Sequence, residues 1–341
     1  MSTRGLALAA ATAFALAGRG GVGGGELCIL FASLNVSTFH FGRVDFAAAQ
    51  VLDLLPLPPS LERVYGGCVA GADDGQFFLP NDAVAYNNLL EISIAANTTQ
   101  SKTMSPPVQY AGSVPVFFTM NFDPATGDIR VFFLESTRVA WVAAAIVDPA
   151  KGSSVAISAD FSDAFNTLFM WKKTGVSAYD SKRSRLFFVA KLKAEGSVET
   201  LFGVPVGDAS VPVKFVEIPG PSDNSSDIDF LGYSAPHDLF VATCFNINVG
   251  IASIKIMPAD GAGGDAWQTV HEWPLGAEFD EELGNAALTR DGNTLFVALQ
   301  DPVLLQPSYF SFAVPSGKLL ASFTVPRGQQ ARMLTAEVVA C

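Results

Sequence analysis

The sequence predicts an all-β protein, a six-bladed β-propeller built from four-stranded antiparallel blades. Three observations predict this fold: a unit that recurs at steps of 52 to 56 residues, turn residues between apolar strands in each unit, and complementary chain ends. A ring of seven blades is the alternative count.

The repeating unit is clearest in RDGNTLFVALQD, residues 290–301, where a turn of Asp, Gly and Asn leads into an apolar strand. Similar turns precede the other paired apolar residues of the chain. These anchors follow one another at steps of 55, 55, 52 and 56 residues and are Phe78, Phe133, Phe188, Phe240 and Phe296. A near-constant period of this size is typical of propellers and repeat arrays.

Each unit contains four expected strands, here termed A to D from first to last. Turn residues separate A from B, as hairpins between antiparallel strands require, and a second strand pair follows, as in residues 309–326. The B strands, such as RVFFL (130–134) and TLFVAL (294–299), are apolar on consecutive residues. Strands of this kind are buried on both faces, which is the situation of a blade between two other blades.

The two ends of the chain predict how the ring closes. Residues 27–57 have the pattern of strands B, C and D without a strand A, and residues 332–341 have the pattern of a strand A alone. Pairing of the C-terminal strand with the N-terminal three would complete a split blade and remove the unpaired edges of an open array. We therefore expect five complete units and one shared between the chain ends.

The cysteines provide a test of this closure. Cys28 falls just before strand B of the split blade and Cys341 at the end of its strand A, so the closed ring brings them within reach of a disulfide. We expect this bond. There are two alternatives: Cys341 pairs with Cys68, or all four cysteines, including Cys244, are buried free thiols. No C-x-x-C pair is present, so the sequence does not support a zinc or thioredoxin-like site.

The N-terminus has the pattern of an export signal. An apolar run of about thirteen residues follows Arg4, ends at Ala15-Leu16-Ala17 and meets a glycine-rich stretch. We expect residues 1–17 to be a signal peptide, 18–25 a Gly-rich linker and 26–341 the propeller domain; a disordered Ala-rich leader or a plastid-type transit peptide is the alternative. No stretch reaches the roughly twenty apolar residues of a membrane-spanning helix.

After removal of the signal peptide, we expect the protein to be a monomer that is secreted or resides in the endomembrane lumen. Three sequons fit export and are candidate glycosylation sites: Asn35, Asn97 and Asn224.

Charge narrows the class of partner. The net charge is −12, from 33 acidic against 21 basic residues, and the basic residues are scattered along the chain. Such a surface does not attract phosphates, so we expect no nucleic-acid partner. The expected partner is a protein, a glycan or a small molecule held at the mouth of the channel, where the D–A and B–C loops meet.

Two acidic D–A loops suggest a cation site. Counting eleven residues back from the anchoring phenylalanines places Asp229 and Asn285 in one register near the start of strand A, with Glu282 close by. Carboxylate and amide oxygens suit Ca²⁺ or another divalent cation, although the sequence assures no cofactor. The alternative is a solvated acidic loop.

Histidine catalysis is not expected. His40 and His271 fall on outer strands, and His237 falls in an A–B turn on the face away from the mouth. A Ser-His-Asp or Cys-His arrangement at the mouth is therefore not predicted, and we name no catalytic residue.

The segment GNAALTRDGNTLFVALQD, residues 284–301, resembles the A–B segment of six-bladed propellers in the SMP-30/gluconolactonase, strictosidine synthase-like and YVTN-repeat groups. In the SMP-30 group, this resemblance implies, an Asn at the position of Asn285 helps to hold a divalent metal in enzymes that hydrolyse lactones. The chain departs from that pattern in YGGCVAGADDGQFF (65–78), which lacks the group's ligand glutamate, and at the counted positions Ser177 and Phe122.

We therefore expect a binding or scaffold module, with a metal-dependent hydrolase of the lactonase kind as the alternative.

Overall fold

The protein is described here from a computed structural model. It describes residues 27–33, 36–57, 69–70, 76–81, 88–94, 96–103, 116–123, 125–135, 141–149, 154–160, 169–170, 176–192, 199–206, 216–220, 226–246, 250–260, 267–273, 286–300, 307–326 and 334–340. Every regular element in these ranges is a β-strand. Within them, no helix is long and apolar enough to cross a membrane.

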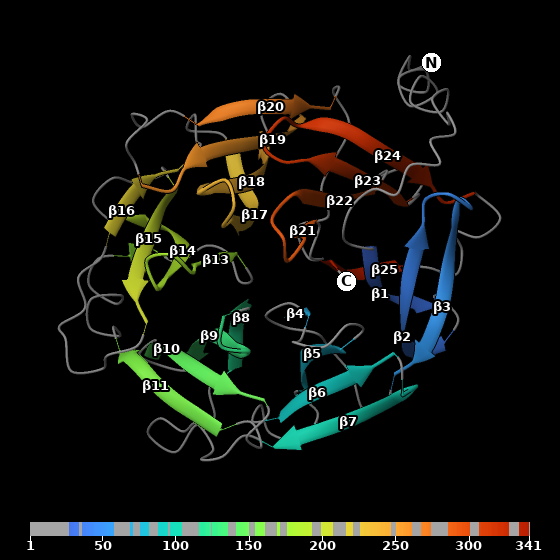
Figure 1. The fold of residues 1–341 in the computed structure, drawn as a ribbon, viewed down its shortest axis with the longest axis horizontal. Helices are drawn as coiled ribbons and strands as arrows, with labels where there is room; N and C mark the ends of the chain where they lie inside the picture. Colours follow the sequence, from blue (N-terminus) through green and yellow to red (C-terminus); the bar gives the residue numbers. More distant parts are fainter. Residues whose placement is uncertain are drawn as a thin grey trace.

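The described strands form six antiparallel sheets, which surround a central axis as the blades of a propeller (Figure 1). Each blade is named below by its innermost strand. Four blades follow the predicted A to D order from the axis outward. They comprise β4 (Val69–Ala70), β5 (Gln76–Asn81), β6 (Asn88–Ser93) and β7 (Thr98–Thr103); β8 (Val116–Asp123), β9 (Asp128–Glu135), β10 (Trp141–Asp148) and β11 (Ser154–Asp160); β17 (Ser226–Ser234), β18 (Leu239–Asn246), β19 (Ile251–Pro258) and β20 (Gln268–Glu272); β21 (Ala286–Leu288), β22 (Thr294–Gln300), β23 (Pro307–Ala313) and β24 (Lys318–Thr324).

A fifth blade has its innermost strand in two pieces. Both pieces pair with the same B strand, so the sheet has five strands although its plan is that of the others. Its strands are β12 (Phe169–Met170), β13 (Ser177–Asp180), β14 (Arg185–Leu192), β15 (Glu199–Pro205) and β16 (Val216–Pro219). It is called the β13 blade.

The sixth blade joins the two ends of the chain. Its strand order is β25 (Leu334–Ala340), β1 (Leu27–Ser33), β2 (Val36–Asp45) and β3 (Gln50–Pro56), so the C-terminal strand pairs with the first N-terminal strand. The predicted all-β propeller with split-blade closure is thereby confirmed. Leu27 pairs with Ala340, and Cys28 lies opposite Val339 in this ladder.

The predicted disulfide stays a prediction, because Cys341 and Cys68 lie outside the described residues and the structure describes only the backbone of Cys28. Cys244 lies in the interior of β18, where it is 1% exposed.

The innermost strands make a closed cycle. Neighbouring strands contact one another in the order β25, β4, β8, β13, β17, β21 and back to β25. In this cycle β8 and β21 stand opposite each other, three steps apart in either direction. This cycle of inner strands surrounds the axis of the ring (Figure 1).

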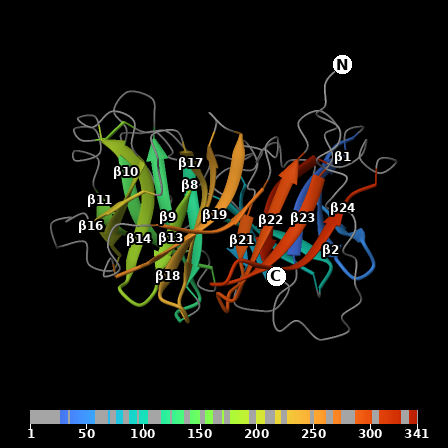
Figure 2. The same ribbon diagram turned by 90° about the horizontal axis from the view of Figure 1, so that it is seen from above.

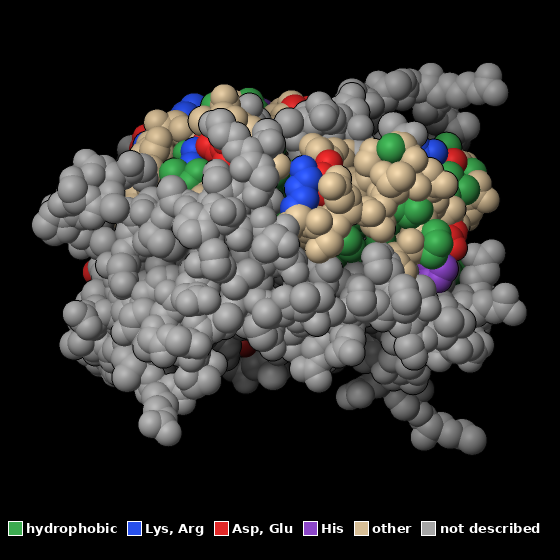
Figure 3. Space-filling view, turned by 90° about the horizontal axis from the view of Figure 1, so that it is seen from below, with side chains coloured by type: hydrophobic (Ala, Val, Ile, Leu, Met, Phe, Trp, Pro, Cys, Tyr) green, Lys and Arg blue, Asp and Glu red, His purple; other side chains and the backbone are tan. Residues whose placement is uncertain are grey.

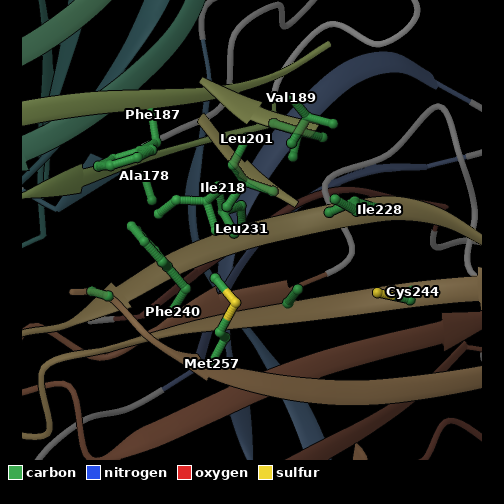
Figure 4. Close-up of a cluster of buried hydrophobic side chains, with 13 residues drawn as sticks. Ala178, Phe187, Val189, Leu201, Ile218, Ile228, Leu231, Phe240, Cys244 and Met257 are labelled. Carbon is green, nitrogen blue, oxygen red and sulfur yellow. The ribbon is translucent and has the colours of Figure 1, made fainter. Parts of the chain in front are cut away.

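The core lies between the blades. In the seam between the β13 and β17 blades, Phe187 and Phe240 pack with ring centres 4.8 Å apart, beside Ile218 and Met257 (Figure 4). Seven of the eight residues of β18 are buried. The consecutive apolar residues of the B strands therefore reflect burial on both faces, as the sequence predicts.

The antiparallel order gives the ring two faces, which Figure 2 shows edge-on. The A–B and C–D turns lie on one face, here called the A–B face, and the B–C and D–A connections lie on the other, the D–A face. Most D–A and B–C connections fall outside the described ranges. On the side of the molecule seen in Figure 3, the basic and acidic side chains that are described are scattered.

Candidate functional site

The inner strand β17 carries a β-bulge at Asp229. Ile228 pairs with Cys244 and Phe230 pairs with the adjacent Thr243, so Asp229 is an extra residue in the ladder. A β-bulge turns the strand locally and re-aims a side chain, and bulges are enriched next to active sites. Asp229 is therefore set apart from the regular residues of its strand.

The same irregularity recurs in other blades. The extra residue of β8 is Phe118, and it lies five residues before the last residue of its strand, Asp123, as Asp229 lies five residues before Ser234. The register of β25 also shifts, with Ala336 as the extra residue. We call the height of the channel at which these three residues lie the bulge level.

The β13 blade is interrupted at a similar height. Six residues, 171–176, separate the two pieces of its inner strand, whereas only two, 189–190, separate their partners in β14. Four blades thus break the regular ladder near one height of the channel. That height is the candidate functional site.

Two carboxylates and one ammonium group lie at residues near Asp229 in the chain or in the neighbouring blade, and Asp229 itself is half-buried. Glu199, the first residue of β15 in the neighbouring blade, is 1% exposed, and its Oε2 accepts a hydrogen bond of 2.7 Å from the backbone N–H of Ile228. The Nζ of Lys191 lies 3.9 Å from Oδ1 of Asp227. Lys191 is also the register partner of Glu199. The balance of charge among these four side chains is negative, which favours cations and hydrogen-bond donors.

Of the predicted metal ligands, the structure places Asp229 at the bulge level. Asn285 and Glu282 lie outside the described residues, so the complete set stays a prediction. Among the side chains that are described, no group of three or more His, Cys, Asp and Glu has an arrangement that would hold a metal.

The predicted equivalence of Asp229 with Ser177 and Phe122 is wrong. Phe122 pairs with Ile129 beside the A–B turn, and Ser177 pairs with Phe188 three residues before the end of its strand. The anchoring phenylalanines lie at different distances from their turns, so a fixed count along the chain does not reach the same height in each blade. The presence of Phe122 therefore says nothing about the ligands at the bulge level.

Glu199 was not predicted from the sequence. It lies thirty residues before Asp229 and in another blade, and only the packing of the two blades brings it to Ile228. No local sequence pattern distinguishes Glu199, since a single Glu at the start of a C strand is normally exposed to solvent.

The A–B face has a different character, since polar contacts tie its turns together. Oγ of Ser234 donates to the carbonyl of Gly292 in the next blade at 2.8 Å, and His237 contacts Asn293 at 3.0 Å. Gly292 has a φ of +69°, and a side chain there would crowd Ser234. The Asp-Gly-Asn turn is thus fixed both by its own conformation and by its neighbour.

The three histidines lie where the sequence predicts. His40 is on β2, His271 is on the outermost strand β20, and His237 is exposed in an A–B turn. None of these three side chains belongs to the bulge level.

The predicted sequon Asn97 is exposed in the turn between β6 and β7. The sequons at Asn35 and Asn224 lie in parts of the chain that the structure does not describe.

The chain is similar to solved structures at low sequence identity. The structure of TolB from Acinetobacter baumannii matches 93% of this chain and 66% of the TolB chain, with a TM-score of 0.58 at 10% identity. A protein from Lactobacillus plantarum matches 93% of this chain and 99% of its own length, with a TM-score of 0.48 at 12% identity. The Dos1 propeller matches 78% and 63%, with a TM-score of 0.41 at 12% identity.

No protein-family model and no curated protein matches the chain. The likeness to the SMP-30 and related groups stays at the level of architecture. At 10% identity, the likeness to TolB shows that this chain has a β-propeller fold.

Proposed function

We propose that the chain is a secreted or lumenal binding module that holds its ligand at the D–A end of the channel, on the bulge level. The observation that carries this proposal is the recurrence of the bulge in β8, β17 and β25, with the acidic Asp229 as the extra residue of β17. Register shifts also occur between outer strands, but these three lie on the strands that surround the channel, and bulges next to active sites re-aim side chains.

The charge of the site limits the ligand. Three acidic residues, Asp227, Asp229 and Glu199, and one basic residue, Lys191, belong to the described part of this seam. The partner in this proposal is a protein, a glycan or a small molecule that presents positive charge or hydrogen-bond donors. Location outside the cytosol rests on the N-terminal signal pattern and is supported by the exposure of Asn97.

A metal-dependent hydrolase of the lactonase kind is the second candidate. The sequence analysis predicts Asp229 as a metal ligand, and the structure places this residue at a bulge of an inner strand. This position favours the hydrolase. Asp229, Asn285 and Glu282 would hold Ca²⁺ or another divalent cation, which would polarise a carbonyl group and lower the pKa of bound water.

Two measurements test these functions on the purified mature chain. The first is binding to an immobilised glycan array and to an oligoarginine peptide, by wild type, Asp229→Asn and Glu217→Gln. Glu217 is exposed on the outer strand β16, so its variant removes one negative charge away from the site. We expect D229N to weaken binding about tenfold, the loss of a charge-assisted contact, and E217Q to leave it unchanged. Binding that is equally strong in all three proteins contradicts the proposed site.

The second measurement is thermal unfolding with and without Ca²⁺ or Zn²⁺. A cation at 100 times its Kd stabilises the folded state by about 2.7 kcal/mol if it does not bind the unfolded chain. The hydrolase requires such a rise in melting temperature in wild type and its loss in D229N. If neither cation shifts the melting temperature, the metal-dependent hydrolase is rejected and the binding module is the function that remains.

A further inference from the structure

The bulge at Asp229 leaves part of the backbone of β17 to be satisfied from outside its own sheet. β17 is the innermost strand of its blade, so one of its edges has no partner strand within that sheet. The backbone N–H of Ile228, the residue before the bulge, is bound by the side chain of Glu199 from the next blade. A buried backbone donor must find a partner, and here that partner is a carboxylate.

Glu199 is itself held in place. Its backbone pairs with Lys191 in β14, and its carbonyl oxygen accepts a hydrogen bond of 3.0 Å from the N–H of Gly220. A side chain at residue 220 would overlap that carbonyl oxygen, so the chain end of β16 lies directly against Glu199. The carboxylate therefore projects from a fixed backbone.

Burial of a carboxylate at 1% exposure is costly unless hydrogen bonds compensate for the loss of water. The contact of 2.7 Å with Ile228 has the length of a charge-assisted hydrogen bond, which is stronger than a neutral one. An apolar side chain at residue 199 would leave the N–H of Ile228 without this acceptor. The carboxylate of Glu199 thus contacts the residue that directly precedes the extra residue of the bulge.

We infer that Glu199 is the positioning residue of the ligand site: it holds the backbone at Ile228 and thereby aims the carboxylate of Asp229 into the bulge level. This inference rests on the proposed function, because it takes Asp229 as the residue that meets the ligand. Glu199 acts through Asp229, and the ligand class is the cationic or hydrogen-bond-donating one.

The test compares five variants with the wild-type mature chain, one of which is Asp229→Asn. Glu199→Ala removes the acceptor, Glu199→Asp keeps the charge and shortens the side chain, and Glu199→Gln keeps an acceptor at full length without the charge. Glu217→Ala is the matched control in the same blade. One readout is the amide exchange rate of Ile228, and the other is the affinity for the oligoarginine peptide, measured by calorimetry.

We expect E199A and E199D to raise the exchange rate at Ile228 and to weaken peptide binding about tenfold, because the charge-assisted contact made by Asp229 is no longer held in place. E199Q should keep the protection of Ile228 and most of the affinity, and E217A should match the wild type in both. D229N should weaken peptide binding about tenfold while Ile228 stays protected. Because E199D keeps the charge and shortens the side chain by only one methylene group, it serves if E199A does not fold.

Two results would overturn the inference. One is unchanged exchange at Ile228 in E199A and E199D, and the other is an equal loss of affinity in E199Q and E199A with Ile228 protected in both, which would make Glu199 a direct charge partner. Failure of the proposed function looks different. A wild-type chain that binds neither Ca²⁺ nor the cationic peptide rejects Asp229 as a ligand residue, even where Ile228 loses its protection in E199A.

Discussion

The guanidinium of Arg290 lies over the ring of Phe122, with its central carbon 5.2 Å from the ring centre. Phe122 is the last but one residue of β8, and Arg290 lies in the turn after β21. Because these two strands stand opposite each other in the ring, the contact crosses the axis at the A–B face. A cation–π contact thus spans the end of the channel that lies away from the bulge level.

Removal of this contact should lower the stability of the fold only slightly and should leave ligand binding at the bulge level unchanged. Arg290 is exposed, so we expect Arg290→Ala to lower the free energy of unfolding by about 0.5–1 kcal/mol in urea denaturation. Arg290→Lys should lose less, because a cation remains. A double-mutant cycle with Phe122→Ala measures the pair itself, and strictly additive effects would contradict a direct interaction.

The buried pair of Asp123 and Arg130 should be far more sensitive. The two side chains are 4% and 7% exposed, their contact is 2.7 Å long, and Arg130 also lies over the ring of Tyr179. Burial by itself raises the pKa of the Asp123 carboxyl, but hydrogen bonds from Arg130 and from the backbone N–H of Ala125 outweigh it, so the pKa lies below its ordinary value.

We therefore expect Asp123→Ala to cost about 3 kcal/mol, because it leaves the buried Arg130 charge with only the more distant carboxylate of Asp128, 3.7 Å away, as its acidic neighbour. The double variant with Arg130→Met should recover part of that loss. Urea denaturation of wild type, the two single variants and the double variant checks this, and a double variant as unstable as the sum of its parts would count against the buried pair.

The ion pair that joins the β13 and β17 blades should weaken at low pH. Arg183 binds both oxygens of Asp238, at 2.8 and 3.0 Å. This contact lowers the pKa of Asp238 to about 2. Because the folded pKa lies below the unfolded value of about 3.9, the stabilisation is full above about pH 4 and is lost as the pH falls through 2.

Asp238→Asn should accordingly destabilise the protein by about 0.5–1 kcal/mol at pH 6, a value reduced by the partial exposure of the pair. The difference from wild type should narrow as the pH falls from 4 to 2. Thermal unfolding across this range checks the prediction, which fails if the difference is the same at every pH.

His271 should make the packing between the β17 and β21 blades sensitive to pH. Its ring packs against Trp273 and Phe312, with centres 4.9 and 4.7 Å away. Burial lowers the pKa of His271, against a smaller opposing effect of Glu272. The fold therefore favours the neutral ring, and this stabilisation is full above the unfolded pKa of about 6.5 and is lost as the pH falls through the lower folded value.

His271→Phe keeps the aromatic packing without a titrating group. We expect wild type to lose stability relative to this variant as the pH is lowered from 7, in urea denaturation at a series of pH values. Trp273→Phe should change stability by the same amount at each pH. Parallel pH profiles for wild type and H271F would show that His271 is not the titrating group.

Much of the fold follows from local patterns. The Asp291-Gly292-Asn293 turn marks a hairpin because Gly292 takes a positive φ, and the apolar run around Phe296 marks a strand buried on both faces. Register within a blade does not follow in the same way. The anchoring residue Phe240 pairs with Tyr233 next to its turn, whereas Phe133 pairs with Phe117 beyond a bulge, and the near-constant spacing of the anchors in the sequence hides that difference.

The sequence by itself determined the all-β class, the strand pattern within each unit and the docking of the C-terminal strand on the N-terminal three, since hydrophobic periodicity and turn chemistry are local properties. It also singled out Asp229. Only the tertiary structure decided the rest: a bulge at Asp229 that recurs in other blades, the Glu199 carboxylate at the N–H of Ile228, and Arg290 over Phe122 at the other end of the channel. These contacts join residues from different blades, and their geometry depends on how whole sheets pack around the axis.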